Sequence, residues 1–216
     1  MKFNHKITRV LLLAGLLATT QANAEISATG GFVSDYYFRG INLGDGGAYT
    51  SVDFEKEGFS AGTWWIDDGN GGNDGLETDY YIAYTKAFEN FSASFGYNRY
   101  EYSYTSDFEQ EFVINLSSGD FSFDIVSGSD DDDGLPSEDY SVYILGYSQS
   151  YFGVTIGTGD YDDLTDASWS WLELSFSGDI VEGVSASLNL GVKTDDLTGT
   201  QDDGYIYLDI SKSFDL

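Results

Sequence analysis

The stretch GVSASLNLGVK, residues 183–193, alternates apolar and polar residues over its whole length. Valine, alanine and leucine occupy every second position from Val184 to Val192, and serine, asparagine or glycine stands between them. A period of two places successive side chains on opposite faces of a β-strand. The stretch therefore predicts a strand with one apolar and one polar face.

The same alternation recurs along the rest of the chain, for example in Phe91–Tyr97 and in Phe121–Ile125, and it predicts an all-β protein. Residues after position 24 show no sustained period of 3.6, which would indicate helices. The pattern predicts twelve strands, an even number. They lie near residues 26–39, 47–56, 59–67, 76–87, 91–103, 108–117, 120–127, 139–148, 151–160, 168–177, 183–193 and 204–216.

The connections between these segments alternate in length. Tight turns such as EKEG, FEN, SSG and SQS separate long, acidic connections such as INLGDGG, DDGNGGNDG, SGSDDDDGLPS and KTDDLTGTQDDG, and the short YTS is the exception. This pattern is typical of an antiparallel transmembrane β-barrel of about 12 strands, with short periplasmic turns and long extracellular loops. A soluble β-sandwich requires neither an even strand count nor long loops at one end.

Two further features favour a closed barrel. Pro136, the one proline, lies in a predicted loop, as expected if every strand is paired on both sides. The chain also ends inside a predicted strand, with Phe214 and Leu216 on the same face. A terminal strand of this kind can pair with the first strand and close the barrel.

Residues 1–24 have the features of a secretory signal peptide. Lys2, Lys6 and Arg9 precede an apolar run from Val10 to Ala18, and Ala22-Asn23-Ala24 supplies small residues for cleavage. The apolar run is much shorter than the roughly 20 residues of a membrane-spanning helix. We expect the mature chain to begin at Glu25, with residues 25–216 forming one barrel domain.

The composition excludes several function classes. Without residues 1–24 the chain keeps all 37 Asp and Glu but six of nine Lys and Arg, a formal net charge of −31. Nucleic acid would repel such a chain. The chain has no Cys, and its one histidine, His5, leaves with the signal peptide. Histidine- or cysteine-dependent catalysis and zinc binding are therefore excluded.

The N-terminal motifs resemble a known family. SDYYFRGIN, Ser34–Asn42, is followed by a predicted hairpin and by AGTWW, and ETDYYIAYTKAFENFSASFGYNRYEY supplies a second hairpin. This order resembles the N-terminal half of the TorF-like porins, small Gram-negative proteins whose first strand ends in a similar motif. The resemblance is most specific over residues 34–64 and weakens after about residue 120. It implies an outer-membrane barrel that forms a pore, without naming a solute.

Strand parity predicts which side chains line the pore. If Phe32, Tyr36 and Phe38 face lipid, then Asp35, Tyr37 and Arg39 face the lumen. We expect Arg39 either to pair with carboxylates of neighbouring strands or only to hold the register of the first strand. The same parity places further residues in the lumen, and the whole set carries a formal charge of −7: Asp53, Glu55, Asp79, Glu109, Glu111, Asp124, Glu173, Lys193 and Asp209.

Acidic residues could also bind metal or act in catalysis. The runs SGSDDDDG and GDYDDLTD lack the spacing of a calcium loop, and solvated external loops are the favoured interpretation. Glu109 and Glu111 stand two residues apart, but carboxylates are so abundant here that the spacing carries little weight. We therefore predict no enzyme, no cofactor and no metal.

Three function classes remain open: a pore, a non-conducting structural or adhesive barrel, and a secreted soluble protein that binds carbohydrate through its aromatic residues. A twelve-stranded barrel leaves a lumen of about 5–6 Å radius, which suits small solutes. The side chains of Tyr37, Trp64, Tyr81, Trp171 and Tyr207 could also plug it. The expected partners are outer-membrane lipid, lipopolysaccharide, the barrel-assembly machinery and small solutes. The transported solute and the oligomeric state stay open.

Overall fold

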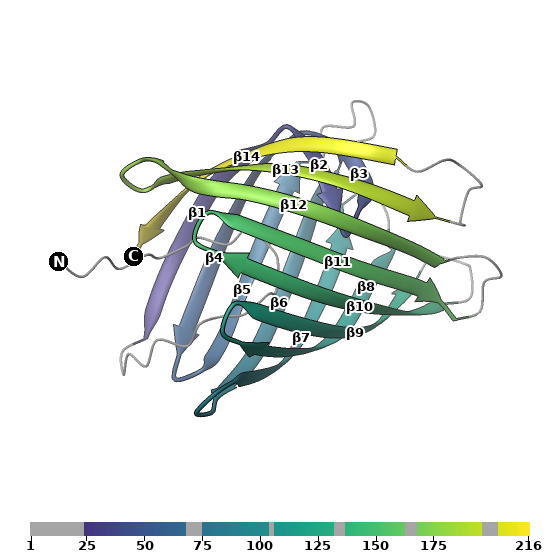
Figure 1. The fold of residues 1–216 in the computed structure, drawn as a ribbon, viewed down its shortest axis with the longest axis horizontal. Coiled ribbons are helices and arrows are strands. Elements are labelled where there is room, and N and C mark those ends of the chain that lie inside the picture. The colour runs from purple at the N-terminus through teal and green to yellow at the C-terminus, as the bar shows by residue number, and fades with distance from the viewer. Residues whose placement is uncertain (1–23, 68–74, 104–105, 132–136, 163–167, 196–202) are drawn as a thin grey trace.

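The protein folds into a closed barrel of twelve antiparallel strands, β1 and β4–β14, and β1 pairs with β14 to complete the ring (Figure 1). A computed structural model describes residues 24–67, 75–103, 106–131, 137–162, 168–195 and 203–216; the predicted signal peptide lies almost wholly outside them. The wall strands are β1 (Glu25–Val33), β4 (Ala48–Lys56), β5 (Phe59–Asp67), β6 (Leu76–Ala87), β7 (Ser92–Tyr102), β8 (Phe108–Ser118), β9 (Phe121–Asp131), β10 (Glu138–Gln149), β11 (Phe152–Tyr161), β12 (Ser168–Val181), β13 (Val184–Asp195) and β14 (Asp203–Asp215).

The predicted twelve-stranded barrel is confirmed, but three strands differ in extent by four residues or more. The first wall strand ends at Val33 rather than at residue 39, and residues 35–45 form a separate hairpin of β2 (Asp35–Phe38) and β3 (Ile41–Asp45). The strand predicted over 120–127 continues to Asp131, because its polar end still pairs with β8 and β10. The strand predicted over 168–177 continues to Val181 through a register shift.

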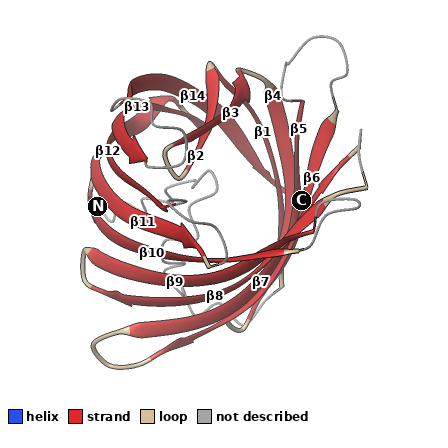
Figure 2. Cartoon of the chain, turned by 90° about the vertical axis from the view of Figure 1, so that its right-hand side faces the viewer, coloured by secondary structure: helices blue, strands red, loops and turns tan. Residues whose placement is uncertain are grey.

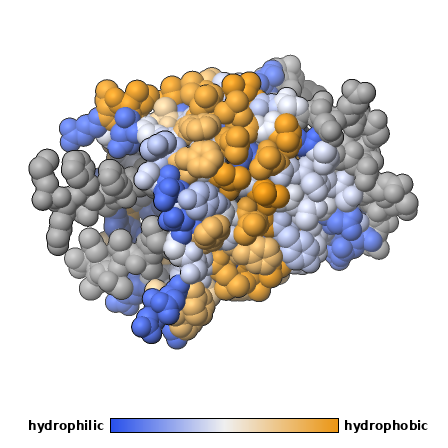
Figure 3. Space-filling view, viewed as in Figure 1, coloured by the Kyte–Doolittle hydropathy of each residue, from blue (hydrophilic) through white to orange (hydrophobic). Residues whose placement is uncertain are grey.

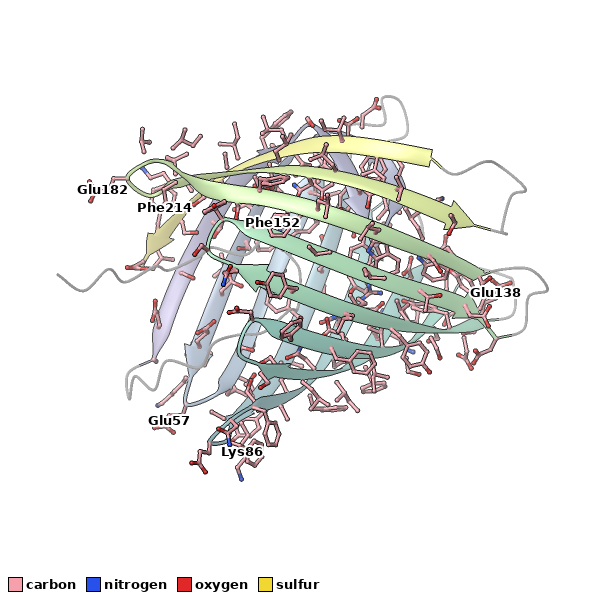
Figure 4. All side chains as sticks on the ribbon, viewed as in Figure 1. Glu57, Lys86, Glu138, Phe152, Glu182 and Phe214 are labelled. Atoms are coloured by element: carbon pink, nitrogen blue, oxygen red, sulfur yellow. The ribbon has the colours of Figure 1, made fainter. Side chains whose placement is uncertain are left out.

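The tight turns gather at one end of the barrel. Glu57 and Gly58 join β4 to β5 with φ values of 50° and 85°, the two positive values that a two-residue type I′ hairpin turn requires. In Figure 4, Glu57, Lys86 and Glu182 lie at this end and Glu138 lies at the opposite end. These four charged side chains therefore stand at the rims rather than around the middle of the barrel.

The outer surface of the barrel is apolar around its middle. Ile82, Ile114, Ile156, Leu172 and Leu208 are between 38% and 51% exposed although they are large and aliphatic. Figure 3 shows an apolar band across the face in view, with hydrophilic residues toward the two ends. Such a band, on strands with a polar inner face, is typical of an outer-membrane barrel.

Among the described residues, no helix is long and apolar enough to cross a membrane.

The inner wall uses glycine to accommodate large aromatic rings. Gly157 lies directly across from Trp171 and Gly191 directly across from Tyr205, and a Cβ on either glycine would overlap the partner's ring. The ring therefore lies against its neighbour strand rather than projecting toward the barrel axis. The same arrangement joins four further cross-strand pairs: Gly31–Tyr49, Gly62–Tyr81, Gly128–Tyr140 and Gly159–Trp169.

Candidate functional site

The β2–β3 hairpin leaves the wall and folds into the lumen. The wall ends where the Ser34 amide donates to the Leu208 carbonyl at 2.9 Å. Beyond it, the ring of Tyr37 stacks on that of Tyr205 of β14, with 4.2 Å between centroids. Figure 2 shows both hairpin strands inside the ring of wall strands. The hairpin begins at β1 and contacts inward-facing residues on well-separated parts of the wall.

This hairpin corrects the expectation that Tyr36 and Phe38 face lipid. The Tyr36 hydroxyl donates to Glu77 of β6 at 3.1 Å, and its ring lies 5.8 Å from that of Trp64. The Phe38 ring lies 6.0 Å from that of Tyr100 of β7. Both side chains are lumenal because the alternation of sides that holds along β1 no longer applies once the chain leaves the wall at Ser34.

INLGDGG is likewise not an external loop. It supplies β3, which pairs back on β2. The hairpin tip is a two-residue turn in which Arg39 has φ 51° and Gly40 has φ 81°. The sequence signal for it was the Phe-Arg-Gly-Ile tetrapeptide, with glycine at the second turn position between two short alternating segments.

Arg39 attaches the tip to the far wall. In the strand order, β8 stands seven places from β1 in one direction and five in the other, so it lies almost opposite. Arg39 Nη1 lies 2.5 Å from Glu111 Oε1 and Arg39 Nη2 lies 3.0 Å from Oε2. The indole Nε1 of Trp169 donates to the Arg39 carbonyl at 3.2 Å. The hairpin therefore crosses the lumen from β1 to β8.

Most lumenal carboxylates accept hydrogen bonds from tyrosine. Tyr49 donates to Asp209 at 2.9 Å, Tyr102 donates to Glu109 at 3.1 Å, and Tyr81 donates to Asp53. Tyr205 and Tyr207 both donate to Glu173, at 3.1 and 3.3 Å. Asp124 receives its bond from the Asn115 amide. These neutral donors satisfy the carboxylate oxygens but add no positive charge. Tyr81 and Tyr207 were expected in the lumen only as possible plugs, and Tyr49, Tyr102 and Tyr205 were missing from our expected site, although parity also places them inside.

The residues expected to line the pore occupy different surroundings. Glu111, Asp79, Asp124, Asp209 and Glu173 are between 1% and 8% exposed. Three positions lie on the hairpin: Asp35, Tyr37 and Arg39. Asp53 and Glu109 are half-buried on the inner wall, Lys193 is half-buried beside Gly40, and Glu55 is exposed near the turn to β5.

The inner wall is lined differently at its two ends. Near the tight turns, inward positions carry small hydroxyl side chains, and two pairs of them bond across strands, Thr29 with Ser213 and Ser92 with Ser117. Toward the hairpin, inward positions carry aromatic rings, including those of Trp169 and Trp171, which belong to one buried cluster against which Ile41 of β3 packs. The described part of the lumen is therefore lined by small hydroxyl side chains near the turns and by aromatic rings near the hairpin.

The fold is similar to solved membrane-protein structures. An outer-membrane channel from Pseudomonas putida F1 matches with a TM-score of 0.54 and 11% identity, over 96% of this chain and 100% of that one. A protein from work on the in-meso crystallization of membrane proteins matches with a TM-score of 0.58 and 8% identity, over 89% and 84%. Acinetobacter baumannii OccAB4 matches with a TM-score of 0.46 and 11% identity over 89% of this chain, which spans 62% of that one. No protein-family model and no curated protein matches the chain.

The first of these likenesses shows a fold that the chain shares with a known outer-membrane channel. The apolar belt and the closed ring are properties of this chain itself, and together they suit only a surface that faces lipid on the outside. The protein is an outer-membrane β-barrel. The narrower assignment to the TorF-like porins rests on sequence motifs alone.

Proposed function

We propose that the protein is an outer-membrane channel for the passive diffusion of small solutes, with a preference for cations or zwitterions. The observation that carries this proposal is the lumenal set of carboxylates held by tyrosine hydroxyls. Among the residues that the structure describes, Glu173 and Asp209 receive side-chain hydrogen bonds from tyrosines alone, so no base balances their formal charge in those bonds. A lumen narrower than the Debye length of about 8 Å keeps the sign of its wall charge.

Several further features belong to the same proposal. The chain acts without chemistry on the solute, and its acidic long loops face the cell exterior. Its motifs at residues 34–64 place it among the TorF-like porins. Its partners are lipid, lipopolysaccharide and the barrel-assembly machinery. The proposal also includes export through a signal peptide that is cleaved after Ala24, directly before β1.

A non-conducting structural barrel is the second candidate, and one observation favours it. The hairpin lies across the lumen, and Glu111 beside its tip is only 1% exposed. A side chain that lined a permanently open path at this level would be reached by water. Under this alternative, the purified protein would insert into a bilayer without conducting.

Reversal potentials in a planar bilayer under a salt gradient test the proposal. We expect cation preference in the wild type and a lower ratio of cation to anion permeability in the double variant Glu173→Gln/Asp209→Asn. Glu101→Gln is the matched control, since the Glu101 side chain is 44% exposed and pairs with Arg99 on the outward side of β7. Anion preference would overturn the charge argument, and absence of conductance would favour the structural barrel.

A further inference from the structure

Glu111 forms the centre of a pocket built by three wall strands. Tyr100 of β7 donates to Oε2 at 2.8 Å, and Tyr140 of β10 donates to Oε1 at 2.9 Å. The amide of Asn98 lies 3.4 Å from Oε2. The carboxylate is thus oriented by neutral donors from the wall, with one face of its two oxygens directed at the hairpin.

The group that fills this pocket comes from a different element. The guanidinium of Arg39 meets Glu111 with both terminal nitrogens, one on each oxygen. This paired geometry is the one in which a planar guanidinium matches a carboxylate, and a lysine ammonium cannot reproduce it. The ring of Phe38 lies 4.4 Å from the guanidinium carbon and covers one face. Donors, acceptor and stacking ring together form a complete guanidinium site.

The paired contact at the tip is stronger than the other contacts that hold the hairpin. Arg39 has a φ of 51°, which the two-residue turn requires, as it does of Glu57 in the turn between β4 and β5. This turn places the guanidinium where it meets Glu111. The hairpin otherwise meets the wall through aromatic contacts such as Tyr37 on Tyr205 and through single hydrogen bonds such as Tyr36 to Glu77.

We propose that the Glu111 pocket is a guanidinium-binding site of the channel, which the chain's own Arg39 fills as a tethered ligand and thereby holds the hairpin across the lumen. A solute that carries a guanidinium group competes with Arg39 for Glu111 and loosens the hairpin as it passes. The inference rests on the proposed channel function only for this second step. Binding by the pocket is independent of conduction.

Titration calorimetry on the purified, detergent-solubilised barrel tests the pocket, with n-propylguanidinium as the probe. Arg39→Ala empties the site, so we expect this variant to bind the probe with a dissociation constant of roughly 1 mM. Binding should be roughly tenfold weaker for n-propylammonium, which lacks the paired donors. The wild type should bind the probe more weakly, because the probe must displace Arg39 from Glu111. Arg39→Ala/Glu111→Gln, without the acceptor charge, should lose this binding.

Equal binding of the probe by all three proteins would overturn the pocket, because the acidic loops would then account for it. If Arg39→Ala/Glu111→Gln binds the probe as tightly as Arg39→Ala does, the pocket is likewise overturned, because Glu111 would not be the acceptor. Migration of unheated and heated samples on a detergent gel checks that each variant is folded. If Arg39→Ala does not fold, Arg39→Gln, which is closer in volume and still uncharged, takes its place with the same expectations.

Conductance tests the competition step. At constant ionic strength, millimolar n-propylguanidinium should raise the conductance of the wild type more than n-propylammonium does, and this difference should vanish in Glu111→Gln. Arg99→Gln is the control, because Arg99 lies on the outward side of β7 and pairs with Glu101. Equal effects of the two probes on the wild type would overturn the competition. A wild type that never conducts would refute the channel function, whereas the calorimetric result for the pocket would stand.

Discussion

Tyr49 illustrates how single residues let the lumen hold many carboxylates with few bases. Its hydroxyl lies 3.1 and 2.9 Å from the two oxygens of Asp209, a carboxylate that is only 5% exposed. A buried carboxylate without hydrogen bonds is strongly destabilising, and a phenol supplies the bond without neutralising the charge. The tyrosine ring fits because it packs over Gly31 on the neighbouring strand.

Removing one such hydroxyl should therefore destabilise the barrel. We expect Tyr49→Phe to lower the free energy of unfolding by about 1.5–3 kcal/mol, because Asp209 loses a bond to a charged group while the ring still fills its place over Gly31. Urea unfolding in lipid vesicles, followed by tryptophan fluorescence, measures the change. The matched control is Tyr143→Phe on the outer surface, where Tyr143 is 48% exposed and a change within about 0.5 kcal/mol is expected. Equal losses for both variants would contradict the argument.

At the scale of elements, the wall strands were predictable and the hairpin was not. Alternation and turn residues located strands such as Phe59–Asp67 and Leu76–Ala87 at their observed bounds, because every wall strand separates lipid from lumen. FVSDYYFR was predicted to belong to one continuous wall strand over residues 26–39, yet its second half leaves the wall at Ser34. Sequence periodicity indicates that the two faces of a strand differ in polarity, but it does not indicate whether the strand lies in the wall or in the lumen. The Arg39–Glu111 pair spans 72 residues, and no local pattern indicates it.

The ends of the hairpin are so close together that it can be removed without opening the barrel. The Val33 amide donates to the Gly47 carbonyl at 3.0 Å, so deletion of residues 35–45 leaves Ser34 and Gly46 as a two-residue turn between β1 and β4. We expect this deletion variant to fold as a twelve-stranded barrel with a larger single-channel conductance than the wild type. Planar-bilayer recordings measure it. A folded variant with unchanged conductance would show that the hairpin does not restrict the path.

At the scale of the whole molecule, charge and hydrophobicity are separated between two surfaces of one thin wall. Asn115 and Asp124 are bonded to each other on the inside, and the adjacent Ile114 is 44% exposed on the outside. A one-residue shift of register would exchange these surfaces. This constraint explains why the apolar belt was predictable from sequence in nearly every strand. Which lumenal side chains bond to one another depends on three-dimensional packing, and these pairs were not predictable from the sequence.

The belt predicts a cost that depends on depth in the membrane. Ile114 stands near the middle of β8 and faces outward, so we expect Ile114→Arg to lower the free energy of unfolding by about 2–4 kcal/mol, the range for a cation facing lipid at the bilayer midplane. Gln110 faces outward near the start of the same strand. Gln110→Arg should lower the free energy of unfolding by at most about 1 kcal/mol, because the headgroup region solvates the cation. Urea unfolding in lipid vesicles compares the two variants. In detergent micelles, which have no fixed bilayer thickness, the difference between the two variants should be smaller. Equal losses of stability in lipid vesicles would mean that Ile114 is not held at the depth of the hydrocarbon core.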